Sequence, residues 1–145
     1  MTKINTDYFA RCIATLDRAF NALQKLETED ELYDIYRAAC VKEFEIILEQ
    51  SGKLVKKCLM PYFASPKQAD RLTFKDIFRH AAKFSFITLE ESERWLLYRD
   101  NRNDTAHDYG EGFAEKTLQL LPLFIVDARH LYEVIQHHDP SLTDS

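Results

Sequence analysis

Residues that form tight turns are scarce in this chain of 145 residues, which has only three glycines and four prolines. Folds built from β-strands need many tight turns, and such turns depend heavily on glycine and proline. The scarcity therefore predicts long helices with few connections. The sequence also lacks a run of about 18 uncharged apolar residues, and it lacks an N-terminal basic region followed by an apolar stretch. We expect neither a membrane-spanning helix nor a signal peptide.

Cysteine is scarce as well. The chain has three cysteines, Cys12, Cys40 and Cys58, and no Cys-x-x-Cys pair. An odd number at such wide spacing argues against a disulfide scaffold and against a zinc site. Because each cysteine lies among apolar neighbours, we expect three buried, reduced thiols. Reduced thiols fit a protein of the cytoplasm.

Two common signatures of bound cofactors are absent. No glycine-rich phosphate loop occurs, so we expect that this chain does not bind ATP by itself. No paired Glu-x-x-His occurs, although a di-metal helical bundle requires one. The sequence therefore predicts neither a metal site nor a cofactor.

Apolar residues at helical spacing are abundant. From Phe9 to Leu26 they recur at alternating steps of four and three residues, which is typical of a helix in a bundle. A capping box at Thr88–Glu91, a similar capped start at Thr73–Asp76 and a helix-ending signal at Ser51-Gly52 mark further boundaries. We expect helices over about residues 5–26, 29–51, 53–63, 73–84, 88 to past 95, and from just after Gly112 to 138. These elements predict one domain over residues 1–145 and an all-α fold, an up-and-down antiparallel four-helix bundle with an additional short helix.

The net charge of −5 hides an uneven distribution of charged residues. Residues 51–85 carry eight basic and two acidic side chains, whereas the segments before and after them are acidic. One set of basic residues in this middle segment recurs every four residues: Arg71, Lys75, Arg79 and Lys83. Such a row is either a solvated helix face or a surface that binds RNA or an acidic partner protein. The sequence leaves both alternatives open.

Polar side chains gather at the end of the helix that begins at Thr88. Residues on one face change from apolar to polar along the chain: Leu89, Glu93, Leu96, Asp100, Asn103 and His107. Burying Asp, Asn and His is costly unless each finds a partner, so a polar end on a buried seam is a candidate site. Two other interpretations remain: the helix leaves the core after Leu97, or the polar residues form a satisfied network between two subunits.

The segment from Arg102 to Tyr109, Arg-Asn-Asp-Thr-Ala-His-Asp-Tyr, resembles the Arg-Asn-x3-His-x-Tyr motif of the HEPN superfamily. The similarity is greatest to the HepT-like branch, whose members are also named nucleotidyltransferase substrate-binding proteins. It extends over nearly the whole chain, through the order of the helices and the position of the motif before the last long helix. The motif is fairly specific, because it combines four residue types at fixed spacing.

The resemblance implies a bundle of four or five helices that forms a homodimer, with the two motifs facing each other across the interface. It also implies a partner protein, a minimal nucleotidyltransferase. Characterised relatives are toxins of toxin–antitoxin pairs. They are metal-independent endoribonucleases that are neutralised when the partner transfers AMP from ATP to the motif tyrosine. By this resemblance Arg102 and His107 are catalytic, Asn103 orders the site, and Tyr109 accepts AMP.

The residue types suit that chemistry. A neutral imidazole can take the proton of a 2′-hydroxyl, and a guanidinium can stabilise a phosphorane. Arg102 and His107 are five residues apart, or about 140° around an ideal helix, so one straight helix does not bring them together. Either the helix breaks near Asp104, or Arg102 of one subunit works with His107 of the other.

Three acidic residues complicate the interpretation of this chain as a ribonuclease. Asp100, Asp104 and Asp108 follow one another at steps of four and either orient the catalytic residues or repel phosphate. We therefore keep two functions from the sequence: a HepT-like ribonuclease, and a non-catalytic subunit that binds a nucleotidyltransferase and presents substrate to it. A helical interaction module with neither role is the third alternative.

Overall fold

The regular structure of this protein is helical, and no strand occurs among the residues that the structure describes. The computed structural model describes residues 3–104 and 111–143. Its elements are α1 (Asp7–Gln24), α2 (Glu31–Leu59), the 3₁₀ helix η1 (Met60–Tyr62), α3 (Pro66–Asp70), α4 (Phe74–Lys83), α5 (Leu89–Asp104), α6 (Glu111–His137) and the 3₁₀ helix η2 (Pro140–Thr143). The predicted all-α fold is therefore confirmed.

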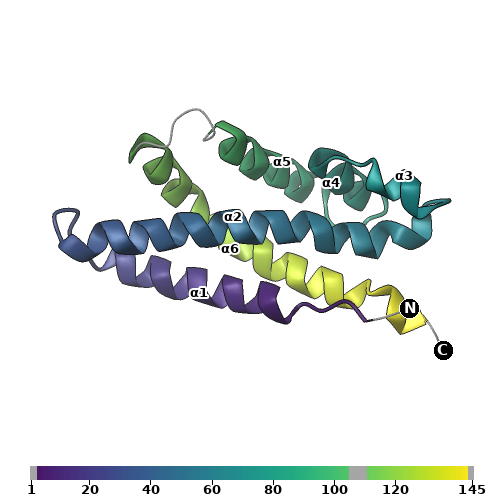
Figure 1. Ribbon diagram of the computed structural model, residues 1–145, viewed down its shortest axis with the longest axis horizontal. Coiled ribbons are helices and arrows are strands. Elements are labelled where there is room, and N and C mark those ends of the chain that lie inside the picture. Colours follow the sequence, from purple (N-terminus) through teal and green to yellow (C-terminus); the bar gives the residue numbers. More distant parts are fainter. Residues whose placement is uncertain (1–2, 105–110, 144–145) are drawn as a thin grey trace.

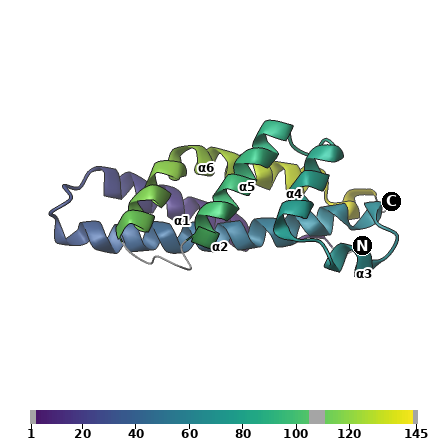
Figure 2. The same cartoon turned by 90° about the horizontal axis from the view of Figure 1, so that it is seen from above.

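Four long helices, α1, α2, α5 and α6, form the bundle, and α2 lies at its centre. Helix α2 contacts α1, α4, α5 and α6, and it runs along the longest axis of the molecule (Figure 1). Tyr33 binds Glu115 near the start of both α2 and α6, and Cys58 contacts Ile135 near their ends, so these two helices run parallel. Helices α1 and α5 run in the opposite direction. Seen from above, α5 crosses over α2 and α6 with α4 beside it (Figure 2).

The helices that lead to the motif begin at side-chain caps. At the start of α4, Thr73 Oγ1 accepts from the Asp76 N–H and the Asp76 carboxylate accepts from the Thr73 N–H, both at 3.1 Å. At the start of α5, Thr88 and Glu91 form the same reciprocal pair. Each cap satisfies N–H groups that have no partner inside the helix. The capping boxes read from the sequence therefore mark the true starts of α4 and α5.

The expected end of a helix at Ser51-Gly52 is wrong, because α2 continues without interruption to Leu59. The segment expected as a separate helix from residue 53 is the last part of α2. Gly52 is buried in the middle of the helix, and a Cβ built on it would lie only 2.9 Å from Cδ2 of Phe74 in α4. The glycine is needed for the close approach of α4 to α2, and it does not end the helix.

Aromatic rings fill the space where four helices meet. Trp95 of α5 is fully buried and lies between Phe78 of α4 and Phe124 of α6, with ring centroids 5.0 and 5.6 Å away. Phe124 in turn packs on Phe44 of α2 at 4.6 Å. Truncating such a buried ring to alanine costs about 3–5 kcal/mol. This cluster fixes α5 against the rest of the bundle.

The three cysteines are free and buried, as expected. Burial raises the pKa of the Cys40 thiol to about 11, and burial together with the charge of Asp139 raises the pKa of Cys58 to about 12. Both thiols are therefore protonated and unreactive near neutral pH. In residues 3–104 and 111–143, no helix has the length and apolar character needed to cross a membrane.

Candidate functional site

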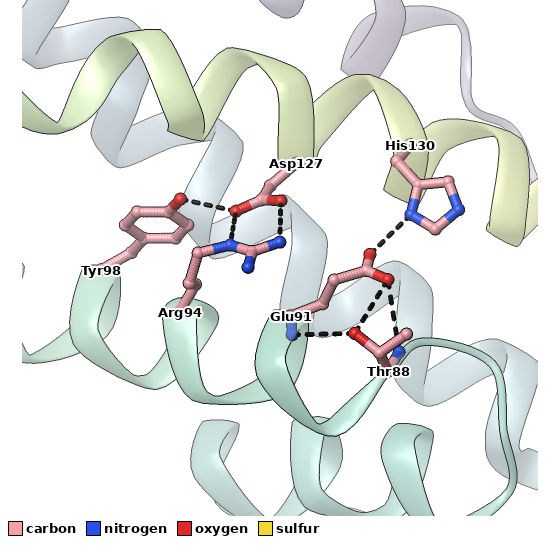
Figure 3. Close-up of polar contacts among 6 residues, drawn as sticks. All are labelled: Thr88, Glu91, Arg94, Tyr98, Asp127 and His130. Atoms are coloured by element: carbon pink, nitrogen blue, oxygen red, sulfur yellow. Dashed lines mark hydrogen bonds and ion pairs between the residues drawn. The ribbon is translucent and has the colours of Figure 1, made fainter.

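A buried carboxylate holds α5 against α6. Asp127 of α6 is 2 % exposed, and it accepts two parallel hydrogen bonds of 2.8 Å from Nε and Nη2 of Arg94 (Figure 3). The hydroxyl of Tyr98 donates a third bond of 2.6 Å to the same carboxylate. Burial and the Asp127 carboxylate raise the pKa of Tyr98 far above its usual value, which keeps this hydroxyl a donor. Three charge-assisted bonds at one point hold the helix rigidly.

A second contact lies one turn nearer the start of α5. One carboxylate oxygen of Glu91 belongs to the capping box with Thr88, and the other lies 2.5 Å from Nδ1 of His130 in α6 (Figure 3). Glu91 is almost completely buried, whereas His130 is about half exposed. The pair therefore joins the start of α5 to α6 at the surface.

A third contact lies beside the motif itself. Asn101 of α5 donates from Nδ2 to Thr117 Oγ1 of α6 at 3.0 Å, and both residues are buried. The other amide atom, Asn101 Oδ1, is buried with no partner among the described residues. Because residues 101 and 117 flank the motif segment on both sides in sequence, this bond holds the two helices together at the base of that segment.

Arg102 lies at the surface next to α2. Its Nη2 is 3.8 Å from Glu49 Oε2, and its side chain is 30 % exposed. Asp100 pairs with Lys75 of α4, with Nζ and Oδ1 2.6 Å apart. The structure thus places Arg102 beside Glu49 of α2, and Asp100 beside one lysine of the predicted cationic row.

Other predicted site residues cannot be placed beside Arg102. The backbone of Asn103 and Asp104 forms the end of α5, but their side chains lie outside the described residues, as do His107 and Tyr109. The roles expected for these four residues remain predictions.

The face predicted to start on a buried seam is not the buried face of α5. Leu89 is 69 % exposed and Glu93 is exposed. The core side of the helix instead carries Ser92, Trp95, Tyr98 and Asn101. The helix buries this side because the large rings of Trp95 and Tyr98 remove more apolar surface from water than the leucines could.

The cationic row is also not a single helix face. Arg71 lies just after the end of α3, so only Lys75, Arg79 and Lys83 belong to α4. Arg79 and Lys83 are exposed, whereas Lys75 is turned toward α5 by its bond to Asp100. The turn between α3 and α4 breaks the four-residue spacing that the sequence suggested.

Sequence reasoning missed the residues that fix α5. Asp127 stands alone in the apolar run from Leu120 to Ala128, and a lone carboxylate in such a run signals a buried ion pair. Arg94 and Tyr98 are four residues apart on one helix, so both can point at one carboxylate, and this spacing could have identified them as its partners. In the described part of the chain, no three His, Cys, Asp or Glu side chains converge as metal ligands would.

Comparisons with known proteins point to one family. Residues 8–137 match the family described as nucleotidyltransferase substrate binding protein like. The chain is 28 % identical over 123 residues to a Haemophilus influenzae protein named probable ribonuclease HepT, a match that covers 85 % of this chain and 80 % of that one.

Two solved structures share the fold. A Haemophilus influenzae protein, whose structure is reported to reveal the fold of a substrate binding domain of a nucleotidyltransferase, superposes with a TM-score of 0.76 at 24 % identity. That match covers 91 % of this chain and 99 % of the other. A protein from Thermus thermophilus superposes with a TM-score of 0.69 at 21 % identity, covering 88 % of this chain and 98 % of the other.

Proposed function

Because this chain belongs to the HepT-like family of nucleotidyltransferase substrate-binding proteins, we propose that it is the ribonuclease component of a toxin–antitoxin pair whose partner is a minimal nucleotidyltransferase. The observation that carries the proposal is the position of Arg102. It stands at the end of α5, anchored by contacts to α6 and α2, directly before the segment with the remaining motif residues. The relative named probable ribonuclease HepT supports the same activity.

The proposed reaction needs no metal ion. His107 takes the proton from a 2′-hydroxyl, and the 2′-oxygen attacks the adjacent phosphorus. The bond to the 5′-oxygen breaks, leaving a 2′,3′-cyclic phosphate on one product and a 5′-hydroxyl, protonated from solvent, on the other. Arg102 stabilises the negative charge that builds up on the phosphorane. Asn103 orders the segment, and Asp100 and Asp104 orient the cationic groups.

We propose that the protein acts as a homodimer. Leu97 of α5 and Leu123 and Val126 of α6 are 61, 49 and 58 % exposed. They belong to stretches of α5 and α6 that lie side by side, because Arg94 and Tyr98, before and after Leu97, both bind Asp127, the neighbour of Val126. A second copy related by a two-fold axis would cover this apolar surface and bring Arg102 of one copy to His107 of the other.

The partner would silence the site by modifying it. The hydroxyl of Tyr109 attacks the α-phosphorus of ATP in the nucleotidyltransferase, pyrophosphate leaves, and the phenolic proton passes to solvent. The bound AMP then adds bulk and negative charge two residues from His107, which repels RNA. ATP and RNA are both cytoplasmic, and three buried free thiols suit a reducing compartment, so we place the pair in the cytoplasm.

One observation favours the alternative function, a non-catalytic subunit that binds the nucleotidyltransferase and presents substrate to it. Arg102 is paired with Glu49, and Lys75 is paired with Asp100. The carboxylates of Glu49 and Asp100 therefore lie where an RNA phosphate would bind these cations. In that case Tyr109, or a molecule held near it, is the substrate and the chain itself cleaves nothing.

The test is RNA cleavage by the pure protein in EDTA. We expect the wild type to cleave mixed RNA and both Arg102→Ala and His107→Ala to lose that activity. Arg129→Ala is the control, because Arg129 pairs with Asp17 on another face of the bundle and should leave cleavage unchanged. Absence of cleavage by the wild type, with intact binding to the nucleotidyltransferase, would establish the alternative.

A further inference from the structure

Arg99 is a second arginine next to the catalytic one. It lies three residues before Arg102 on α5, so the two side chains leave the same side of the helix. Arg99 is half-buried, and its Cζ lies 5.3 Å from the centre of the Phe74 ring in α4. A guanidinium over an aromatic face is held in place by the attraction between its charge and the ring.

Arg99 has no carboxylate within ion-pair distance among the described residues. Five other arginines do have such a partner: Arg37 with Glu115, Arg79 with Asp76, Arg94 with Asp127, Arg102 with Glu49 and Arg129 with Asp17. The remaining three, Arg11, Arg18 and Arg71, are exposed to solvent, whereas Arg99 is half-buried. Burial and repulsion from Arg102 lower the pKa of Arg99, and the charge of Glu49 only partly opposes them. A half-buried cation beside a like charge is unfavourable unless an anion joins it.

The surroundings of Arg99 are positive. Four cations and two carboxylates gather where α2, α4 and α5 meet: Lys53, Lys75, Arg99, Arg102, Glu49 and Asp100. Glu49 is shared between Lys53 and Arg102, and Asp100 is bound by Lys75. Arg99 is therefore the cation of this group that has no carboxylate of the described residues within ion-pair distance.

We propose that Arg99 binds a backbone phosphate of single-stranded RNA next to the phosphate on which Arg102 acts. A guanidinium presents its donors in a planar fork that matches a phosphate, and the Phe74 ring fixes the orientation of that fork before RNA arrives. This inference rests on the proposed function, which names RNA as the ligand. It adds a binding residue that lies outside the Arg102–Tyr109 motif.

Gly52 contributes to the site through Phe74. Because Gly52 has no side chain, the Phe74 ring can lie directly against α2 while Arg99 lies over the ring. Phe74 and Gly52 are thus positioning residues, and Arg99 is the residue that contacts phosphate.

Binding of a strand that cannot be cleaved tests the inference. A fluorescent single-stranded oligonucleotide with 2′-O-methyl groups is titrated with wild-type protein, Arg99→Gln, Arg99→Lys and Arg129→Gln over a series of KCl concentrations, and anisotropy is recorded. We expect Arg99→Gln to weaken binding roughly tenfold and to lower the salt slope by about 0.7, the value for one phosphate contact with a single strand. Arg99→Lys should retain the slope, because it retains the charge, and should bind more weakly than wild type.

The matched control loses the same charge elsewhere. Arg129→Gln should bind within about twofold of wild type, because the lost charge faces Asp17 and is screened from the site. Thermal unfolding of each variant shows whether the bundle is intact, and Arg99→Lys gives the answer if Arg99→Gln does not fold.

Three results would overturn the inference. The first is a salt dependence of binding in Arg99→Gln equal to that of wild type. The second is an equal loss of affinity for the strand in Arg99→Gln and Arg129→Gln. The third is no binding of the strand by wild type. An Arg99→Gln variant that binds RNA normally but loses the nucleotidyltransferase would instead assign Arg99 to the partner protein. Failure of the ribonuclease activity itself is distinguishable, because a protein that cleaves nothing can still bind the uncleavable strand through Arg99.

Discussion

Arg94 binds Asp127 through two hydrogen bonds of equal length, 2.8 Å, from Nε and Nη2 to the two carboxylate oxygens. The bond from Tyr98 to the same carboxylate makes Asp127 the point at which α6 holds the middle of α5. The motif begins one turn beyond Tyr98, so the position of Arg102 depends on this contact.

Replacing Asp127 by asparagine should destabilise the protein strongly. Asparagine keeps the shape of the side chain but removes the charge that binds Arg94, and a broken, largely buried pair costs about 2–4 kcal/mol in the free energy of unfolding. Asp17→Asn is the control, because its pair with Arg129 is more exposed and should be worth less than about 1 kcal/mol. Urea unfolding followed by circular dichroism measures both, and equal losses would contradict the role given to Asp127.

Two glycines inside helices should respond to alanine in opposite ways. Gly52→Ala places a Cβ against the Phe74 ring, and the cost of overpacking, about 1–3 kcal/mol, exceeds the gain of about 1 kcal/mol in helix propensity. At Gly112 nothing lies within 4 Å of the new Cβ, so alanine should stabilise by a few tenths to about 1 kcal/mol. The melting temperatures of the two variants, compared with that of wild type, test this prediction. A Gly52→Ala protein as stable as wild type would contradict it and would show that α4 can move away from α2.

These two sites show what the sequence can and cannot predict. Helical spacing and the capping boxes at Thr73 and Thr88 are local, so the helices and two of their starts could be read directly. From the sequence Gly52 looks like the end of a helix. The contact that requires a glycine there is with the ring of Phe74, 22 positions further along the chain, and local sequence does not show it. The buried side of α5 was misjudged because two of its faces carry apolar residues, and the choice between them depends on what Trp95 meets on α4 and α6.

Stability should fall in acid through Asp139. Burial raises the pKa of this carboxyl. Hydrogen bonds from the N–H groups of Ser141 and Ile4, together with the charge of Lys3, lower the pKa by more than burial raises it, so the net shift is downward. A folded-state pKa below the unfolded value means that the stabilisation is complete above about pH 4 and is lost as pH falls through the folded pKa. Wild type should exceed Asp139→Asn in stability at pH 6, and the difference should shrink below pH 4, which urea unfolding across that range would measure. A difference that stays constant with pH would exclude this linkage.

The exposed apolar surface on α5 and α6 should control assembly. Leu97→Asp combined with Val126→Asp places two charges where the second copy would pack, and we expect the dimer to become a monomer of 17.0 kDa in sedimentation velocity. Ile35→Asp is the matched control, because Ile35 is equally exposed, at 62 %, but lies on α2. A monomeric wild type would contradict the proposed dimer. Dissociation by Ile35→Asp, and not by the double variant, would place the interface on α2.

The central claim is a metal-independent ribonuclease site that Arg102 of one copy and His107 of the other form together. Mixing two inactive variants, Arg102→Ala and His107→Ala, tests it most directly. Random exchange of subunits makes half of the dimers mixed, and each mixed dimer has one intact site out of two, so RNA cleavage in EDTA should return to about a quarter of the wild-type rate. A mixture that stays as inactive as either variant, while wild type cleaves under the same conditions, would contradict a site shared between subunits, and a wild type that cleaves nothing would contradict the ribonuclease itself.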